Sequence, residues 1–350
     1  MRILVTGGCG FIGSAVVRHI IYNTKHQVLN IDALMYSASL ESVVEVSHSK
    51  RYQFQIVNIL NKPLLENVFE QFRPEAIMHL AAESHVDRSI DSPEIFIQTN
   101  IVGTYTLLSV AFQYWKNLSK DEKDKFRFHH ISTDEVFGAL HPGDKPFNEQ
   151  TPYDPRSPYS ASKAGSDHLV RSWYHTYGLP TFVTNTTNNY GYWHFPEKLI
   201  PLTIINALEE KTIPVYGKGE NVRDWLFVED HAEALVKAVE QGKPGDTYAI
   251  GARQPRTNLQ VVQTICSTLD ELKPRKKGKY GHLIEFVTDR PGHDFRYEID
   301  PTYAEKNFQW QAKHNFEKGV YKTVQWYLEH RDWWQKIRKM TYDGKRLGLN

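Results

Sequence analysis

Apolar residues form short runs that alternate with helical repeats through the first half of the chain. The continuous runs at 2–6, 27–31, 52–57, 76–80, 126–132 and 181–184 are typical of strands buried on both faces. Between them, apolar positions with helical spacing occur around 14–21, 64–72, 93–115 and 158–177. Strands and helices that alternate in this way predict an α/β fold with a doubly wound (Rossmann) parallel sheet.

The pattern loosens after residue 185, where proline and glycine interrupt short elements. We therefore expect a Rossmann domain at 1–185 and a smaller, mixed α/β substrate lobe at 186–335, with segments near 229–250 returning to the sheet. Residues 336–350 are expected to be a basic C-terminal tail that follows a docked helix. The charged run at 116–125 is interpreted as a solvated loop.

A glycine-rich turn joins the first predicted strand to the first predicted helix. Gly7 permits the tight turn, Gly10 lets the backbone approach a diphosphate, and Gly13 lets the helix pack on the strand. Asp32 ends the second predicted strand, where an acidic side chain can hold ribose hydroxyls and repel a 2′-phosphate. The turn and this acid predict a site for NAD rather than NADP.

Two groups of reactive side chains follow. Tyr159 and Lys163 have the i, i+4 spacing that places both on one face of a helix, where a lysine ammonium favours the ionised form of a phenol. A phenolate base suits the oxidation of an alcohol. Asp134 and Glu135 follow a predicted strand, and two carboxyl groups can protonate a leaving hydroxyl and remove a carbon-bound proton. Oxidation followed by elimination of water is the chemistry that these residues indicate.

Composition favours a small-molecule substrate. A net charge of +1 gives no basic field for nucleic acid, and the 16 histidines lack the clustered spacing of a metal site. The two cysteines, Cys9 and Cys266, do not suggest a disulfide framework, which favours the cytoplasm. We find no apolar run near ~20 residues, so neither a signal peptide nor a membrane span is expected.

The second half carries cationic and polar side chains suited to a nucleoside diphosphate, although any one of them alone is more often a surface charge. These residues are Lys198, Lys218, Arg223, Arg256, Arg290, Arg296, Tyr216, Asn258 and His293.

Sequence motifs along nearly the whole chain resemble those of the extended short-chain dehydrogenase/reductase family, and specifically its dTDP-glucose 4,6-dehydratases. The motifs are Gly7–Gly13, His79–Asp87, Asn100–Thr104, Ser132–Val136, Tyr159–Lys163, Asn188–Gly191, Arg223–Trp225 and Asp289–Asp294. The resemblance implies NAD-dependent conversion of dTDP-glucose to its 4-keto-6-deoxy form, in a cytoplasmic pathway to rhamnose or another deoxysugar.

The same resemblance implies roles for single residues. Tyr159, assisted by Lys163 and Thr133, would deprotonate the sugar 4-hydroxyl, Glu135 would remove the C5 proton, and Asp134 would protonate the leaving C6 hydroxyl. The implied NAD site contains Gly7, Gly10, Phe11, Ile12, Gly13, Asp32, Asn58, Ile59, Leu80, Ala81, Ala82, Ser84, Thr99, Tyr159 and Lys163. The implied substrate site contains Ser84, His85, Thr133, Asn188, Glu197, Lys198, Leu199, Pro214, Tyr216, Arg223, Asn258, Arg290 and His293.

The resemblance also implies a homodimer in which the helices at 93–115 and 158–177 form a four-helix bundle. The chain departs from the family at Ala33, Met35, Asn58, Phe137 and Tyr192, near the expected adenosine pocket and sugar entrance. Two other interpretations stay open: the same chemistry on UDP-glucose or another nucleotide-hexose, and a non-catalytic sensor of NAD or a sugar nucleotide.

Overall fold

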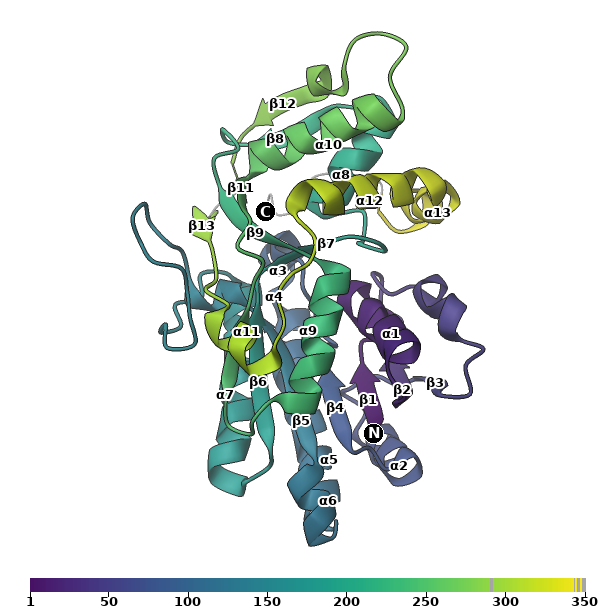
Figure 1. Cartoon of the computed structure of the whole chain (residues 1–350), viewed down its shortest axis with the longest axis vertical. Coiled ribbons are helices and arrows are strands. Elements are labelled where there is room, and N and C mark those ends of the chain that lie inside the picture. The colour runs from purple at the N-terminus through teal and green to yellow at the C-terminus, as the bar shows by residue number, and fades with distance from the viewer. Residues whose placement is uncertain (290–291, 343, 345–346, 348–350) are drawn as a thin grey trace.

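A seven-stranded parallel sheet forms the body of the protein (Figure 1). The computed structural model describes residues 1–289, 292–342, 344 and 347. The strand order is β10-β6-β5-β4-β1-β2-β3, so the chain reverses its direction across the sheet between β1 and β4. Open sheets of this kind bind ligands at the carboxyl ends of the strands beside such a reversal.

The predicted doubly wound sheet is confirmed, and its strand ends lie within two residues of the predicted ones. The strands are β1 (Arg2–Thr6), β2 (Gln27–Asp32), β3 (Tyr52–Ile56), β4 (Ala76–His79), β5 (Arg127–Thr133), β6 (Thr181–Thr186) and β10 (Thr247–Ile250). The last strand, β10, pairs in parallel with β6 although about 60 residues separate them, and it lies in the segment expected to return to the sheet.

Helices cover both faces of the sheet and enclose two apolar cores. One face carries α1 (Phe11–Asn23), α9 (Val228–Gln241) and α11 (Thr302–Phe308), and the other carries α2 (Lys62–Phe72), α5 (Thr104–Lys116) and α7 (Pro158–Tyr177). Successive residues of β1 point into opposite cores. Val5 packs with the side chains of α1 and α9, and Leu4 packs with those of α2, α5 and α7.

A long apolar helix runs along the second face. It consists of α4 (Pro93–Phe96), a π-helical segment, η2 (Ile97–Gly103), and α5, so the predicted helix at 93–115 is confirmed. By length and composition its 24 residues could cross a membrane, whereas the sequence analysis expected no membrane span. The helix packs against α7 and α2, and core helices satisfy the same criterion. We therefore assign it to the body of the protein.

The expectation of a loop at 116–125 was wrong, because residues Lys120–Lys125 form the helix α6. Ser119 and Glu122 make a capping box in which each side chain accepts a hydrogen bond from the other residue's backbone. None of the α6 residues is buried. Local capping therefore produced a helix in a segment whose charge had suggested only solvent exposure.

A second group of elements, here called the lobe, lies above the sheet in Figure 1 and has its own apolar core. Its strands are β7 (Asn188–Tyr190), β8 (Ile213–Tyr216), β9 (Val222–Phe227), β11 (Pro255–Thr257), β12 (Ile284–Val287) and β13 (Arg296–Tyr297), and its helices are α8 (Leu199–Leu208), α10 (Asn258–Leu272), α12 (Phe316–Glu329) and α13 (Arg331–Met340). The helix α13 continues past residue 336, where we expected the tail, because Trp333 and Trp334 are buried in the lobe core. Shorter helices are η1 (Leu40–Val46), α3 (Val86–Asp91), η3 (Asp134–Phe137) and η4 (Tyr280–Leu283).

Candidate active site

Two adjoining cavities open at the carboxyl ends of the strands. One, of about 250 Å³, lies over the glycine turn and is here called the cofactor cavity. The other, of about 320 Å³, lies between the sheet and the lobe and is called the substrate cavity. Tyr159 and Ser132 line both cavities. A ligand in either cavity would thus contact the same catalytic candidate.

All of the residues predicted for NAD line the cofactor cavity. They are Gly7, Gly10, Phe11, Ile12, Gly13, Asp32, Asn58, Ile59, Leu80, Ala81, Ala82, Ser84, Thr99, Tyr159 and Lys163. Gly10 is the N-cap residue of α1 there, so the helix has no side-chain cap, and its first turn contains no acidic residue. Its first backbone N–H groups are therefore available to a diphosphate, which fits the predicted dinucleotide.

The glycine turn leaves no room for side chains. Gly7 adopts a φ of +73°, which favours glycine, and a Cβ atom at Gly13 would lie 2.1 Å from the Gly7 carbonyl oxygen. Asp32 is buried next to this turn and accepts hydrogen bonds from the backbone N–H groups of Cys9 (2.9 Å) and Leu34 (2.8 Å). The Asp32 carboxylate therefore holds the glycine turn against the end of β2, in addition to lining the cavity.

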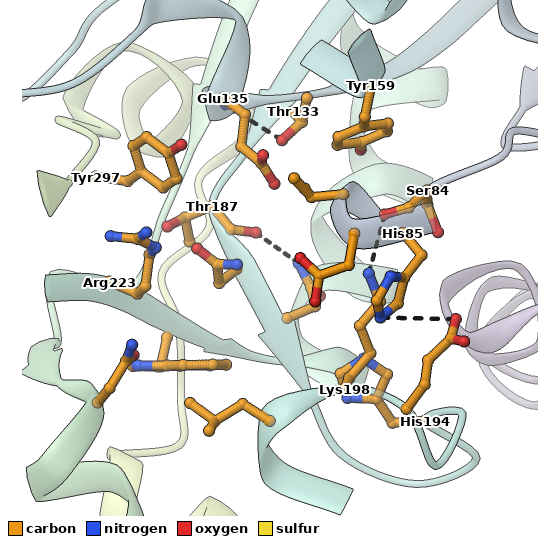
Figure 2. A pocket seen from close by; sticks show the side chains of 18 of the residues that line it. Ser84, His85, Thr133, Glu135, Tyr159, Thr187, His194, Lys198, Arg223 and Tyr297 are labelled. Carbon is orange, nitrogen blue, oxygen red and sulfur yellow. Dashed lines mark hydrogen bonds and ion pairs between the residues drawn. The ribbon is translucent and has the colours of Figure 1, made fainter. Parts of the chain in front are cut away.

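Thr133, Asp134 and Glu135 stand at the end of β5 and the start of η3. Thr133 caps η3, since its Oγ1 accepts a hydrogen bond from the Glu135 backbone N–H at 3.3 Å. Figure 2 shows Thr133, Glu135 and Tyr159 close together at one side of the substrate cavity. The structure thus brings together the two reactive groups that are separate in the sequence.

Asp134 is a strongly perturbed carboxyl group in this cavity. Burial, followed by the nearby Glu135 carboxylate, raises the pKa of Asp134 to about 8. Its Oδ2 atom is buried and has no hydrogen-bond partner among the described residues. At neutral pH Asp134 is therefore protonated, the state in which a carboxyl group can act as a general acid.

Tyr159 and Lys163 are both buried on the first turns of α7, where Ser157 and Ser160 form a capping box. Burial and then the charge of Glu135 raise the pKa of Tyr159, while burial lowers the pKa of Lys163 to about 8. The Lys163 ammonium donates to the Ile131 carbonyl at 2.9 Å. The protein's own groups hold Tyr159 as a neutral phenol, and its expected activation by Lys163 and NAD⁺ stays a prediction.

Twelve of the thirteen residues predicted for the substrate line the substrate cavity. They are Ser84, His85, Thr133, Asn188, Glu197, Lys198, Leu199, Pro214, Tyr216, Arg223, Asn258 and His293. The thirteenth, Arg290, lies outside the described residues. Arg256 and Arg296 do not line this cavity, and they pair with Glu317 (2.9 Å) and Glu298 (2.5 Å). No cluster of metal-ligating side chains occurs in the part of the chain that the structure describes.

Glu197 makes contacts that its sequence position did not suggest. Its carboxylate accepts hydrogen bonds from Tyr36 Oη (2.9 Å) and Arg88 Nε (2.8 Å), and the Arg88 guanidinium lies 4.1 Å from the centre of the Tyr36 ring. Tyr36 and Glu197 line the cofactor cavity. These three residues, here called the Glu197 clasp, join segments from both sides of that cavity.

Three further cavity residues were missed by the sequence analysis. His194 stacks on Phe11 with ring centroids 4.1 Å apart, and both line the two cavities. Thr187 follows the end of β6, a position that could have drawn attention to it. Tyr297 lies beside Arg223 in Figure 2, with the guanidinium 4.1 Å from its ring centroid. No local pattern marks Tyr297, because β13 brings it to the site from far along the chain.

Comparison with known proteins points to one family. The model of the GDP-mannose 4,6 dehydratase family matches residues 4–323. The chain is 56% identical to a dTDP-glucose 4,6-dehydratase of Escherichia coli, covering 100% of this chain and 99% of that protein. It is 57% identical to a dTDP-glucose 4,6-dehydratase of Neisseria meningitidis serogroup B, covering 99% of each.

Solved structures agree with this assignment. A dTDP-glucose 4,6-dehydratase from Bacillus anthracis in complex with NAD is 41% identical, with a TM-score of 0.84 over 96% of this chain and 99% of that chain. The enzyme of the same description from Streptomyces venezuelae, also with NAD bound, is 37% identical, with a TM-score of 0.87 over 96% of this chain and 100% of that chain.

Proposed function

The chain belongs to the GDP-mannose 4,6 dehydratase family, and we propose that it catalyses the NAD-dependent dehydration of dTDP-glucose to dTDP-4-keto-6-deoxyglucose. The observation that carries this proposal is the buried carboxyl group of Asp134 next to Glu135 in the cavity that also contains Tyr159. An enzyme that only oxidised or epimerised an alcohol would not need this pair of carboxyl groups.

When bound in the cofactor cavity, NAD supplies the acceptor for the hydride that leaves C4 and the donor for the hydride that arrives at C6. Tyr159 lies at the junction of the cavities and takes the proton of the sugar 4-hydroxyl, so that the C4–H bond can break as the ketone forms. Thr133 orients this hydroxyl. Lys163, on the next turn of α7, provides the positive charge that favours the phenolate.

The 4-ketone makes the C5 proton acidic, and the two carboxyl groups then divide the elimination between them. Glu135 removes the C5 proton, and Asp134 gives its proton to the departing C6 hydroxyl, which leaves as water. Burial of Asp134 supports its role as the acid. Return of a hydride to C6 and of a proton from Glu135 to C5 completes the 4-keto-6-deoxy sugar. Tyr159 then releases the proton that it took from the 4-hydroxyl and Asp134 takes up a proton, which restores the enzyme for another cycle.

The lobe side of the substrate cavity suits a nucleoside diphosphate. Arg223 and Asn258 supply donors, while Pro214, Leu202 and Val262 supply apolar contacts near them. The Lys198 ammonium donates to the Ser84 carbonyl at 2.9 Å, so it reaches the boundary of the two cavities. We assign the diphosphate to the cationic side chains and the base to the apolar ones.

The function is tested by incubating the purified protein with dTDP-glucose, UDP-glucose and GDP-mannose and following the loss of water by mass spectrometry. We expect dTDP-glucose to be dehydrated fastest, and Tyr159→Phe to be inactive while still binding nucleotide. Faster turnover of another sugar nucleotide would change the substrate and keep the reaction. Binding without turnover of any of the three would favour the non-catalytic sensor and refute the proposal.

We also propose a homodimer formed through α7 and the helix at 93–116. Exposed apolar side chains on that helix support this interface, namely Ile95, Ile97, Val102 and Tyr105. Tyr105→Glu should dissociate the dimer in size-exclusion chromatography with light scattering, whereas Tyr22→Glu, on the exposed side of α1, should not. A dimer unaffected by Tyr105→Glu would place the interface elsewhere.

We propose a cytoplasmic enzyme with an NAD-binding part at 1–185 and a nucleotide-sugar lobe from 186 onward. The separate apolar core of the lobe supports the division, and the returning strand β10 makes it interleaved. Fractionation of cells that express the protein would test the location.

A further inference from the structure

One buried carboxylate outside both cavities gathers polar side chains from several elements. Asp167 on α7 is completely buried, and its Oδ2 atom accepts hydrogen bonds from Ser132 Oγ (2.8 Å), Tyr153 Oη (2.8 Å) and Asn185 Nδ2 (3.2 Å). Its Oδ1 atom lies 3.1 Å from His130 Nε2. The reaction described above gives this cluster no role, although burying an ionised group is costly.

The cluster connects the strand and the helix that carry the catalytic candidates. Ser132 immediately precedes Thr133 at the end of β5, and Asp167 lies one helical turn after Lys163 on α7. Asn185 extends the link, since its Nδ2 also donates to the Thr133 carbonyl oxygen at 3.2 Å. Asp167 thereby fixes the end of β5 against the helix that presents Tyr159.

The charge of Asp167 acts on Lys163. Although burial raises the pKa of Asp167, the hydrogen bond from His130 and the charge of Lys163 hold it below its usual value, so the carboxylate is ionised. Burial lowers the pKa of Lys163 to about 8, and Asp167 is the group that opposes this effect. Lys163 is itself buried, and among the described residues the Ile131 carbonyl oxygen is the hydrogen-bond acceptor of its ammonium group.

We propose that Asp167 is a positioning residue for the dehydratase reaction, which keeps Lys163 protonated and holds the Thr133–Glu135 segment in register with Tyr159. The proposal rests on the proposed function, because it acts through Lys163 and Tyr159. Asp167 itself lines neither cavity and touches no ligand that they could hold.

Few groups near Asp167 and Lys163 can change their charge between pH 6 and 8. The titratable and charged side chains facing Asp167 and Lys163 are His79 from β4, His130 from β5, Tyr153 from the loop after η3, and Tyr159 and Arg171 from α7. Burial lowers the pKa of His130 to about 4, lowers the pKa of His79 well below its usual value, and raises the pKa of Tyr153. Between pH 6 and 8, Lys163 is thus the member of this set whose charge changes.

The test removes the charge and keeps the shape. In Asp167→Asn, a carbonyl oxygen can accept from Ser132, Tyr153 and Asn185, while the new N–H group faces His130 Nε2, which also lies 3.1 Å from Ser166 Oγ. We expect the alkaline limb of enzyme-bound NADH formation from dTDP-glucose to move down by about one pH unit or more. Tyr153→Phe removes the hydrogen bonds that join Tyr153 Oη to Asp167, Arg171 and Asn185 but keeps the Asp167 charge, so it should lower the rate without moving the limb.

A second measurement does not depend on turnover. In the folded variant Lys163 loses its proton at lower pH than in the folded wild type, whereas in the unfolded chain Lys163 keeps its proton. The stability deficit of Asp167→Asn, which is the free energy of unfolding that it loses relative to the wild type, should therefore shrink as pH rises toward 8. Urea unfolding at pH 6, 7 and 8 measures this deficit, and Asp167→Ser is a second charge-free variant if asparagine does not fold.

A constant deficit together with an unmoved limb would overturn the proposal and leave Asp167 a purely structural residue. Equal limb shifts in Asp167→Asn and Tyr153→Phe would also overturn it, since the hydrogen bonds rather than the charge would then be responsible. A wild-type protein without dehydratase activity would refute the proposed function, while the unfolding measurement would still decide whether Asp167 controls Lys163.

Discussion

We expect that keeping Asp134 protonated in the folded protein, as a general acid must be, lowers the free energy of unfolding at neutral pH. Asp134→Asn should therefore give a more stable and far less active protein. Asp134 is 1% exposed, and the pKa of its carboxyl group is about 8 in the folded chain, whereas the ordinary value for an aspartate is 3.8. Between these two values the folded protein holds a proton that the unfolded chain releases. The free energy of unfolding of the wild type therefore falls as pH rises through this window.

The size of the effect follows from the pKa difference. Each pH unit in the window costs the wild type at most about 1.4 kcal/mol, so the loss reaches roughly 4 kcal/mol at pH 7. Asparagine has no such proton to gain. The stability of Asp134→Asn relative to the wild type should therefore increase by about 1 kcal/mol for each pH unit between pH 5 and 8.

The assay is urea unfolding at pH 5, 6, 7 and 8 with saturating NAD⁺. Glu70→Gln, which changes an exposed carboxylate on α2, is the control and should show no comparable increase. Dehydration by Asp134→Asn should fall by about 10²–10⁴-fold, the usual contribution of a positioned general acid. A stability difference that does not change with pH, or one that falls as pH rises, would refute the assignment of a protonated Asp134.

Three further outcomes are expected. Glu135→Gln should lower dehydration by about 10²–10⁴-fold but should still form enzyme-bound NADH with dTDP-glucose, which Tyr159→Phe should not. The wild-type product formed in D₂O should carry deuterium at C5. Dehydration by Glu135→Gln at nearly the wild-type rate would exclude Glu135 as the base. Protein purified without added nucleotide should release NAD(H) on denaturation. Tyr36→Phe, which loses one hydrogen bond of the Glu197 clasp, should lose the dinucleotide faster on dialysis than the wild type does. Equal retention would show that the clasp does not hold the dinucleotide. The ratio of kcat/KM for dTDP-glucose over UDP-glucose should be about 10–200, since one methyl group distinguishes the bases, and a ratio below one would contradict the thymidine assignment.

Local sequence patterns predicted the parts of this protein whose geometry is set over a few residues. The apolar runs identified the sheet strands, because residues buried on both faces leave a continuous apolar segment. The glycine turn before α1 was recognisable because its backbone conformation excludes side chains. The spacing of Tyr159 and Lys163 was sufficient to place both on one helix face. The helix α6 was missed because charge dominated the interpretation over the Ser119 cap.

Tertiary structure alone decided how these residues behave chemically. Asp134 becomes an acid because folding buries its carboxyl group, and this burial raises its pKa even though Thr187 and Arg223, which are far from it in the sequence, act to lower that pKa. Asp167 acquires its partners from β5, β6 and the loop after η3, and Tyr297 reaches the site from β13. Desolvation and Coulomb interactions depend on distances in space, whereas periodicity reports only on neighbours along the chain. The sequence by itself therefore determined which reactive groups the protein has and which elements carry them, and only the folded packing decided their protonation states and the contacts that hold them together.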